Sequence, residues 1–342
     1  MDIKEITSPE RDARSIISDL KYKTVVVKPW AILRKEYEPK EHPVMTDKTY
    51  KDKVTKRGIE KVTRYTLGLQ KLAVKRMTEL MFAIPVQRIY KPENDQEKQV
   101  AEIMEAIFQK NRIDSLNIDR GKSLFASCET ITLWYSQEQE TVYAGQKSLL
   151  KLRCKNYSPM KGDKLYPLFD EYDDMIALSI EYTRKEGINT VTYFDTYTAD
   201  EHIRWRTGAG ETMEELREKI EVGKITGVYI HRDEPIWEDQ SGNVYEAEWT
   251  LSRNGNYIRK NARPNWVVFS DGRVKFGQEP TNDNAGRNVL QYGQNDKAEY
   301  KTWQQAIDSI KFHVGEIKKD FFMQLQLPDM SMENMKATPM SG

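Results

Sequence analysis

One tripeptide of this sequence, Gly121-Lys122-Ser123, has the residue types of a phosphate-binding loop. In such a loop the backbone amides surround the phosphates, and a glycine must stand five residues before the first of the three. Leu116 occupies that position, and the residues around it have a helical rather than a strand pattern. We therefore interpret the tripeptide as a chance match.

The acidic run at 170–174 could offer carboxylate oxygens to a hard cation. No oxygen-rich loop of fixed ligand spacing follows it, so we expect a solvated turn between two strands. The four histidines are scattered, without a Cys or His partner at metal-ligand spacing. We interpret each of them as a surface or edge residue: His42, His202, His231 and His313.

No Gly-x-Ser-x-Gly motif, Cys–His arrangement or isolated carboxylate pair stands out in this sequence. We therefore predict no catalytic residue, no cofactor-binding residue, no metal-binding residue and no cofactor. The helices and strands that would position such residues also favour a structural rather than a catalytic role. The expectation is a protein that is not an enzyme.

The composition of the 342 residues bounds the class of protein. Lys plus Arg and Asp plus Glu both number 53, whereas a broad DNA-gripping face normally brings a basic excess. No run of about 18 apolar residues occurs, so we expect no membrane partner. Cys128 and Cys154 lack a nearby second pair and are interpreted as reduced, buried thiols.

Three helices are expected in the first part of the chain. Residues 1–55, with several prolines and many charges, have the pattern of a loosely organised arm. The apolar stripes predict helices over 58–82, 95–110 and 114–127, with Asn111 ending the second.

From residue 129 the apolar period changes to two, which predicts antiparallel strands. Thr212 and Glu215 form a capping box that predicts a short helix to about residue 222. The pattern lacks βαβ alternation, so the expected fold class is α+β. The expected strands are 130–136 and 141–144, paired as a hairpin, then 149–153, 165–169, 175–184, 190–198, 202–207 and 225–231.

Two apolar seams mark the last third of the sequence. The first repeats every seven residues through 234–260 and favours a helix, although Asn254-Gly255 is a hairpin signal. Gly255 inside a helix costs about 1 kcal/mol relative to Ala, which a closely packed neighbour would make tolerable. The first seam is Trp237, Val244, Leu251 and Ile258. The second is Trp303, Ile307, Ile310, Val314, Ile317 and Phe321.

Between the seams, residues 265–276 predict a small hairpin broken by Asp271-Gly272, and 278–294 predict a loop. Two helices joined by a small β-like insert form a rod with a head. Structural rings and channels are commonly built in this way. The sequence therefore predicts a mechanical component.

The ordered segments of the chain resemble those of the portal proteins of tailed bacteriophages. Leu72–Val86, which ends in Ala-Ile-Pro-Val, resembles the early helix of that family, and the helix with Ile107–Asn111 follows it. The resemblance continues through Tyr166–Asp170, Ile176–Tyr182, Phe194–Thr198, Ile203–Trp205, Val228–Glu238 and Gln326–Lys336. It covers roughly residues 55–342.

The resemblance implies an antiparallel β and helical wing, a two-helix stem and a small β clip. The implied parts are an N-terminal arm at 1–55, a wing at 56–232, a first stem helix at 233–262, a clip at 263–295, a second stem helix at 296–325 and the start of a channel loop at 326–342. Portals of this type continue into a channel helix and a crown after the position of Gly342. The resemblance thus implies a truncated form whose self-assembly is weakened.

The function implied by the resemblance is a structural subunit of the portal ring at the capsid vertex, with a channel for DNA packaging and ejection. Its implied partners are further copies of itself, twelve in a typical ring, the terminase packaging motor, the major capsid or scaffold protein, the head–tail adaptor and the double-stranded DNA in the channel. The implied location is the virion, and the host cytoplasm during assembly.

Two alternatives remain open at this point. One is a nucleotide-dependent or nucleic-acid-processing enzyme of a mobile element, which only Gly121-Lys122-Ser123 favours. The other is a monomeric virion adaptor that uses the same helices on another protein.

Overall fold

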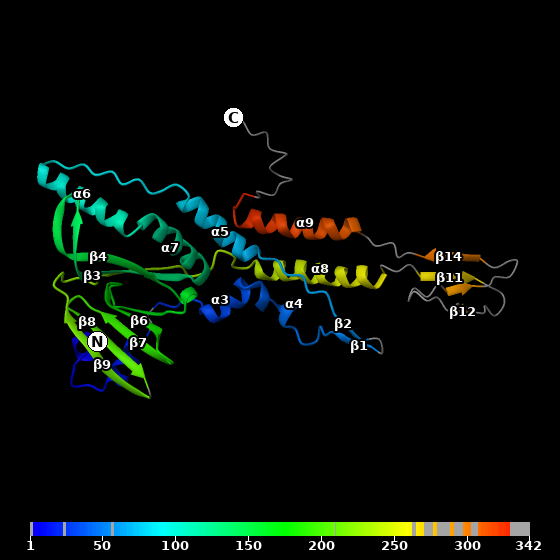
Figure 1. Ribbon diagram of the computed structural model, residues 1–342, viewed down its shortest axis with the longest axis horizontal. Coiled ribbons are helices and arrows are strands. Elements are labelled where there is room, and N and C mark those ends of the chain that lie inside the picture. Colours follow the sequence, from blue (N-terminus) through cyan, green and yellow to red (C-terminus); the bar gives the residue numbers. More distant parts are fainter. Residues whose placement is uncertain are drawn as a thin grey trace. The chain divides into compact units, whose positions relative to one another are not determined.

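The computed structural model describes residues 3–22, 25–55, 58–208, 210–261, 265–269, 276–278, 288–290, 297–301 and 307–328 (Figure 1). The chain forms two compact units. Unit 1 comprises Met1–His42, Leu67–Gly242 and Phe321–Gly342, and unit 2 comprises Pro43–Thr66 and Asn243–Asp320. The described residues mix helices and antiparallel sheets, which confirms the α+β class.

Short helices occupy the first part of unit 1, so the interpretation of residues 1–55 as loosely organised is wrong. Pro39 and Pro43 are each the first residue of a helix, where a missing N–H costs nothing. Ile16 and Leu20 of α2 are buried against Trp205 of the large sheet. The helices are α1 (Ile3–Ile6), α2 (Ala13–Leu20), α3 (Trp30–Tyr37) and the 3₁₀ helix η1 (Pro39–Glu41), followed in unit 2 by α4 (Pro43–Thr46).

Helices α5 (Leu69–Phe82), α6 (Asp95–Lys110) and α7 (Ile113–Ser127) follow the predicted order. The Asn94 side chain accepts the N–H of Glu97 and caps α6, and Asn111 ends that helix as predicted. The predicted helix over 58–82 is wrong in its first part, because residues 58–60 form a strand and α5 begins only at Leu69.

Strands β3 (Glu129–Tyr143), β4 (Gln146–Tyr157) and β10 (Gly227–His231) form a three-stranded sheet in the order β10-β3-β4. Helices α6 and α7 both contact this sheet (Figure 1). The predicted hairpin turn at 137–140 is wrong: β3 passes through that polar segment with a bulge, and the chain turns at Ala144-Gly145, both of positive φ. The 3₁₀ helix η2 (Pro159–Lys161) follows β4.

A five-stranded antiparallel sheet has the order β5-β6-β7-β8-β9. One of its faces packs against α1 and α2 around Trp205, and Ile180 on the other face joins the core that contains Ile131 of β3. Its strands are β5 (Lys164–Phe169), β6 (Met175–Glu186), β7 (Asn189–Tyr197), β8 (Glu201–Gly208) and β9 (Glu211–Lys219).

The short helix predicted from Thr212 and Glu215 is wrong, because these residues lie in β9. β9 pairs along the whole of β8, and the Thr212 and Thr207 hydroxyls lie 3.1 Å apart across the pair. The ladder with β8 supplies hydrogen bonds at every second residue, and this tertiary pairing outweighs the local capping signal.

In unit 2, an extended segment at 61–65 lies along α8 (Ser241–Asn261). Asn256 accepts the N–H of Thr63 at 2.7 Å, and the Ser252 hydroxyl accepts the N–H of Tyr65 at 2.8 Å. Arg259 donates to the carbonyl of Lys61. Helix side chains spaced four and three residues apart therefore satisfy the backbone of this segment.

The predicted helix over 234–260 is confirmed, with a later start at Ser241. The seven-residue seam is only partly buried: Val244 is buried, whereas Ile258 is 55% exposed. Ala247, Glu248 and Ser252 are buried instead, because the period of a straight helix is closer to 3.6 than to 3.5.

The remaining strands of unit 2 pair differently from the prediction. β11 (Asn265–Phe269) pairs with β14 (Lys297–Lys301), and β12 (Phe276–Gln278) pairs with β13 (Asn288–Leu290). Residues 278–294 are thus not purely a loop. The N-terminal hairpin is β1 (Lys53–Thr55) with β2 (Gly58–Glu60).

Helix α9 (Ile307–Gln324) begins later than the predicted second stem helix at 296–325, because residues 297–301 form β14. Along the second seam, Val314 and Phe321 are buried and Ile310 and Ile317 are half-buried. Trp303 lies outside the described residues.

Gly255 packs against the extended segment, and this contact gives a testable prediction. A Cβ at residue 255 would lie 2.7 Å from Cγ2 of Thr63. We expect Gly255→Ala to lose about 1 kcal/mol of unfolding free energy in urea titrations, because the clash outweighs the gain in helix propensity. Gly242→Ala, with nothing within 4 Å of its Cβ, should not destabilise the protein. Adding Thr63→Ser should restore part of the loss; destabilisation from both glycine variants would contradict the packing argument.

Candidate functional site

The tripeptide Gly121-Lys122-Ser123 lies inside α7. Its backbone amides belong to a helix interior rather than to a loop that could surround phosphates. Gly121 is in close contact with α5, because a Cβ there would lie 2.7 Å from the Phe82 ring. The structure therefore supports a packing role for this glycine.

Substitutions at neighbouring residues of α7 test that role. Gly121→Ala should lose about 1–3 kcal/mol of unfolding free energy, because the Phe82 ring must move. Lys122 is exposed, so Lys122→Ala should change stability by less than about 0.5 kcal/mol. Chemical denaturation and calorimetry with ATP provide the readouts. ATP binding that the Lys122→Ala change abolishes would contradict this account.

The acidic run forms the predicted turn, between β5 and β6. The Asp170 carboxylate accepts the N–H groups of Tyr172 and Asp174 at 2.8 and 2.9 Å, so it stabilises the turn itself. Within the part of the chain that the structure describes, no group of three or more His, Cys, Asp or Glu is arranged to hold a metal ion.

The interpretation of His42 as a surface residue is wrong. Its ring is buried, and its Nε2 lies 2.8 Å from the carbonyl oxygen of Glu36 near the end of α3. His202 is also largely buried and stacks on Tyr197, with ring centroids 4.3 Å apart. The imidazole ring has an apolar body, which explains how a residue type expected at the surface fills these positions. His231 and His313 are exposed or lie at an edge, as predicted.

Both cysteines are free thiols, as predicted, although only Cys128 is fully buried. Burial raises the pKa of Cys128 to about 12 and also raises the pKa of Cys154. Both groups are therefore protonated at neutral pH, and a protonated thiol is a poor nucleophile.

A buried carboxylate, Asp195 of β7, is the centre of a charged cluster in the five-stranded sheet. Arg204 on β8 donates to both of its oxygens at 2.8 and 3.0 Å, and the Tyr182 hydroxyl donates at 3.0 Å. Burial raises the pKa of Asp195, but the hydrogen bonds and charge of Arg204, together with the nearby His202, outweigh burial and hold its pKa below the usual value. The cluster therefore fixes the register of neighbouring strands.

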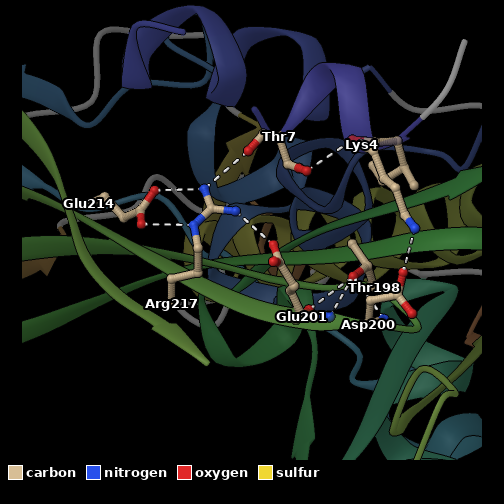
Figure 2. A network of polar contacts seen from close by, with 8 residues as sticks. Lys4, Thr7, Thr198, Asp200, Glu201, Glu214 and Arg217 are labelled. Carbon is tan, nitrogen blue, oxygen red and sulfur yellow. Dashed lines mark hydrogen bonds and ion pairs between the residues drawn. The ribbon is translucent and has the colours of Figure 1, made fainter. Parts of the chain in front are cut away.

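A second polar network attaches α1 to the same sheet (Figure 2). Arg217 of β9 donates to the backbone carbonyl of Thr7 at 3.0 Å and to the carboxylates of Glu201 and Glu214 at 2.7–2.9 Å. Lys4 lies 3.1 Å from Asp200. These groups are partly exposed, so each ion pair contributes little energy, but together they orient the N-terminal helix.

The start of α8 is held by a third set of contacts in unit 1, which we name the α8 entry cluster (Lys28, Glu36, Tyr37, Trp237 and Ser241). Trp237 is 0% exposed, and its indole N–H donates to Glu36 at 2.9 Å. Ser241 donates to the same carboxylate at 3.0 Å. The Tyr37 and Trp237 ring centroids lie 5.6 Å apart. One carboxylate of α3 thus orients the first residue of a 21-residue helix.

The end of α9 is attached to α5 in the same unit. The Arg76 guanidinium lies 4.8 Å from the Phe322 ring centroid, and its Nη1 donates to the carbonyl of Pro328 at 2.7 Å. Sequence reasoning did not identify Arg76, Glu36 or Asp195, because their partners are distant in the chain. The period of two that predicted the strand over 190–198 was the only signal for the position of Asp195.

These clusters share one property: their polar groups connect secondary-structure elements. Carboxylates and guanidinium groups, of which Asp195 is buried and the others are partly exposed, pair with each other and with backbone groups, which is chemistry that positions elements. That the protein has no catalytic, cofactor-binding or metal-binding residues stays a prediction from the sequence. Among the described residues, no helix is both long and apolar enough to cross a membrane.

A comparison with curated proteins found no match. A comparison with protein families found one whose model covers residues 32–342, described as phage portal protein, SPP1 Gp6-like. That match extends over most of the chain and includes the α8 entry cluster from Glu36 onwards. The chain therefore belongs to the SPP1 Gp6-like family of phage portal proteins.

Proposed function

We propose that this protein is a structural subunit of a portal ring and that copies of it surround a channel through which DNA is packaged and ejected. The family match over residues 32–342 carries the proposal. Portal proteins are structural components of the virion rather than enzymes. The alternative of a mobile-element enzyme accordingly has no observation in its favour.

In this proposal, α8 and α9 are the two stem helices and the described strands of 265–301 belong to the clip. α8 has 21 residues and α9 has 18, which corresponds to lengths of roughly 32 and 27 Å at the rise of an α-helix. Unit 1 then supplies most of the wing. The α8 entry cluster and Arg76 hold the ends of the proposed stem helices that belong to unit 1.

Ring closure follows if each copy presents two different surfaces to its neighbours and the rotation between copies divides a full turn. The zero formal charge of the chain is compatible with a wall past which DNA moves, because extensive phosphate contacts would retain it. The proposed partners are further copies, terminase, the capsid or scaffold protein and a head–tail adaptor, in the virion and in the host cytoplasm during assembly.

Light scattering across a dilution series tests this proposal. Assembly follows mass action, so the mean mass should rise from monomer at low micromolar concentration towards rings as concentration increases. Salt at about 0.5 M should weaken assembly without abolishing it, because it screens exposed charges. A mass that stays monomeric up to several hundred micromolar would favour the adaptor alternative.

A further inference from the structure

Strand β4 carries a concentration of positive charge in a chain of zero net charge, whereas the acidic residues of the β3–β4 hairpin lie on β3. Between residues 141 and 162 the sequence has five Lys or Arg and no Asp or Glu. Four of these cations lie on β4, at alternating or nearly alternating positions: Lys147, Lys151, Arg153 and Lys155.

These four cations share one face of the strand, because side chains two residues apart point to the same side. The residues across the pair on β3 include Gln137 and Tyr135, which are opposite Lys151 and Arg153. The other face of the hairpin contacts α6 through β3 and α7 through both strands, and Asn156 of β4 donates to the Leu116 carbonyl of α7. The cationic stripe (Lys147, Lys151, Arg153 and Lys155) therefore lies on the side of the hairpin away from these helices.

None of the four cations of this stripe forms an ion pair within the described residues. Lys151 donates to the Gln139 side chain at 3.0 Å, and Arg153 donates weakly to Gln137 at 3.4 Å. Lys155 instead lies 4.2 Å from the centre of the Tyr157 ring. Burial, together with the charges of Arg184 and Lys161, lowers the pKa of Lys155 despite the opposing charges of Asp163 and Asp195.

Side chains block the outer edge of β4, so a partner strand cannot pair with this part of it. Asn111 accepts the N–H of Cys154 and donates to the carbonyl of Leu152. The hydroxyls of Tyr143 and Ser148 occupy the N–H groups of Leu152 and Leu150. A partner must therefore contact the face of the hairpin and not its backbone edge.

The composition of that face distinguishes between two classes of polyanion. Protein–protein interfaces are depleted in Lys and depend on apolar anchors in pockets. Nucleic-acid interfaces use Lys and Arg on phosphates, supported by Gln and Tyr hydrogen bonds. Cations about 7 Å apart on a strand reach separate phosphates. We propose that the cationic stripe binds the phosphate backbone of duplex DNA without sequence preference, through a contact that does not depend on ring closure.

Fluorescence anisotropy with a labelled 20-base-pair duplex of random sequence tests the proposal between 50 and 200 mM salt. The test variant carries Lys147→Gln, Lys151→Gln, Arg153→Gln and Lys155→Gln. The matched control carries the same loss of charge at four exposed lysines elsewhere: Lys40→Gln, Lys98→Gln, Lys122→Gln and Lys224→Gln. Losing four phosphate contacts should reduce the slope of log affinity against log salt by about three to four.

We expect the control variant to keep the affinity and the salt slope of the original protein, and the test variant to lose about tenfold or more in affinity at 100 mM salt. Equal losses in both variants, no change in either, or no binding by the original protein would overturn the proposal. A stripe-dependent interaction with polyglutamate but not with DNA would also overturn it and indicate an acidic protein partner. Light scattering on the same samples reports ring formation separately from DNA binding. A failure to assemble would contradict only the proposed function.

Discussion

Replacing the buried carboxylate of Asp195 should destabilise the protein strongly. Asp195→Ala leaves the Arg204 guanidinium without the carboxylate that accepts two of its hydrogen bonds, and it removes the acceptor for the Tyr182 hydroxyl. Breaking one side of a buried ion pair costs about 3–5 kcal/mol. Urea titration should show this loss as a lower midpoint with an unchanged slope.

The lowered pKa of Asp195 also predicts that the destabilisation caused by Asp195→Ala depends on pH. The pKa of Asp195 is lowered in the folded protein, so its contribution to stability is present above the unfolded value of about 3.9 and disappears as pH falls through the folded pKa. The stability difference between the original protein and Asp195→Ala should therefore be constant near neutral pH and shrink below about pH 4. Asp200→Ala, which removes an exposed partner of Lys4, should cost less than about 1 kcal/mol. Similar losses from both substitutions would contradict the assigned role of Asp195.

Trp237→Ala should have the second large effect. The indole is fully buried beside Tyr37, and its removal leaves a cavity as well as an unmatched acceptor on Glu36. Removing a buried Trp side chain costs about 3–5 kcal/mol. Thermal unfolding and urea titration should both report the loss.

Trp237→Phe separates the two contributions at this residue. It keeps most of the ring volume and removes the donor to Glu36, so we expect a smaller loss of about 1–3 kcal/mol. Tyr22→Ala, at an exposed aromatic residue, should have little effect and provides the control. Equal and small losses from both Trp237 variants would show that the α8 entry cluster does not stabilise the start of α8.

Elements with strong local signals could be predicted from the sequence. Helix α6 was predicted over 95–110, because its apolar stripe, which includes Val100 and Met104, and the stop at Asn111 agree. The turn at Asp170 was also predicted, because its capping contacts are local. Strands β5 to β8 were also predicted, from their apolar period of two.

The failures have a common physical cause, which is pairing between segments distant from the local signal. The capping box at Thr212 was a valid helix signal, but β8 offered β9 a longer ladder of hydrogen bonds. Residues 297–301 joined β11 across more than 25 residues, so α9 starts later than its apolar seam indicated. His42 is a different case: a nearby carbonyl of α3, that of Glu36, lies within reach of its buried ring, which the sequence alone cannot indicate.

The candidate sites also divide into those that could be judged from the sequence and those that required the fold. Rejection of Gly121-Lys122-Ser123 as a phosphate loop was possible from spacing alone, and its place in α7 agrees with that interpretation. The contacts of Asp195 and Glu36 required the fold, because their partners lie on other strands and helices. The cationic face of β4 also required the fold, since Lys151 and Arg153 had to be placed on one side of an edge strand.

Electron microscopy of negatively stained particles tests the central claim of a ring subunit most directly. The protein would be imaged across a concentration series at low salt, where contacts between exposed charges are least screened. The account predicts closed rings with a central hole in end-on views, in numbers that increase with concentration. Fields of compact single particles without rings at every concentration would contradict it.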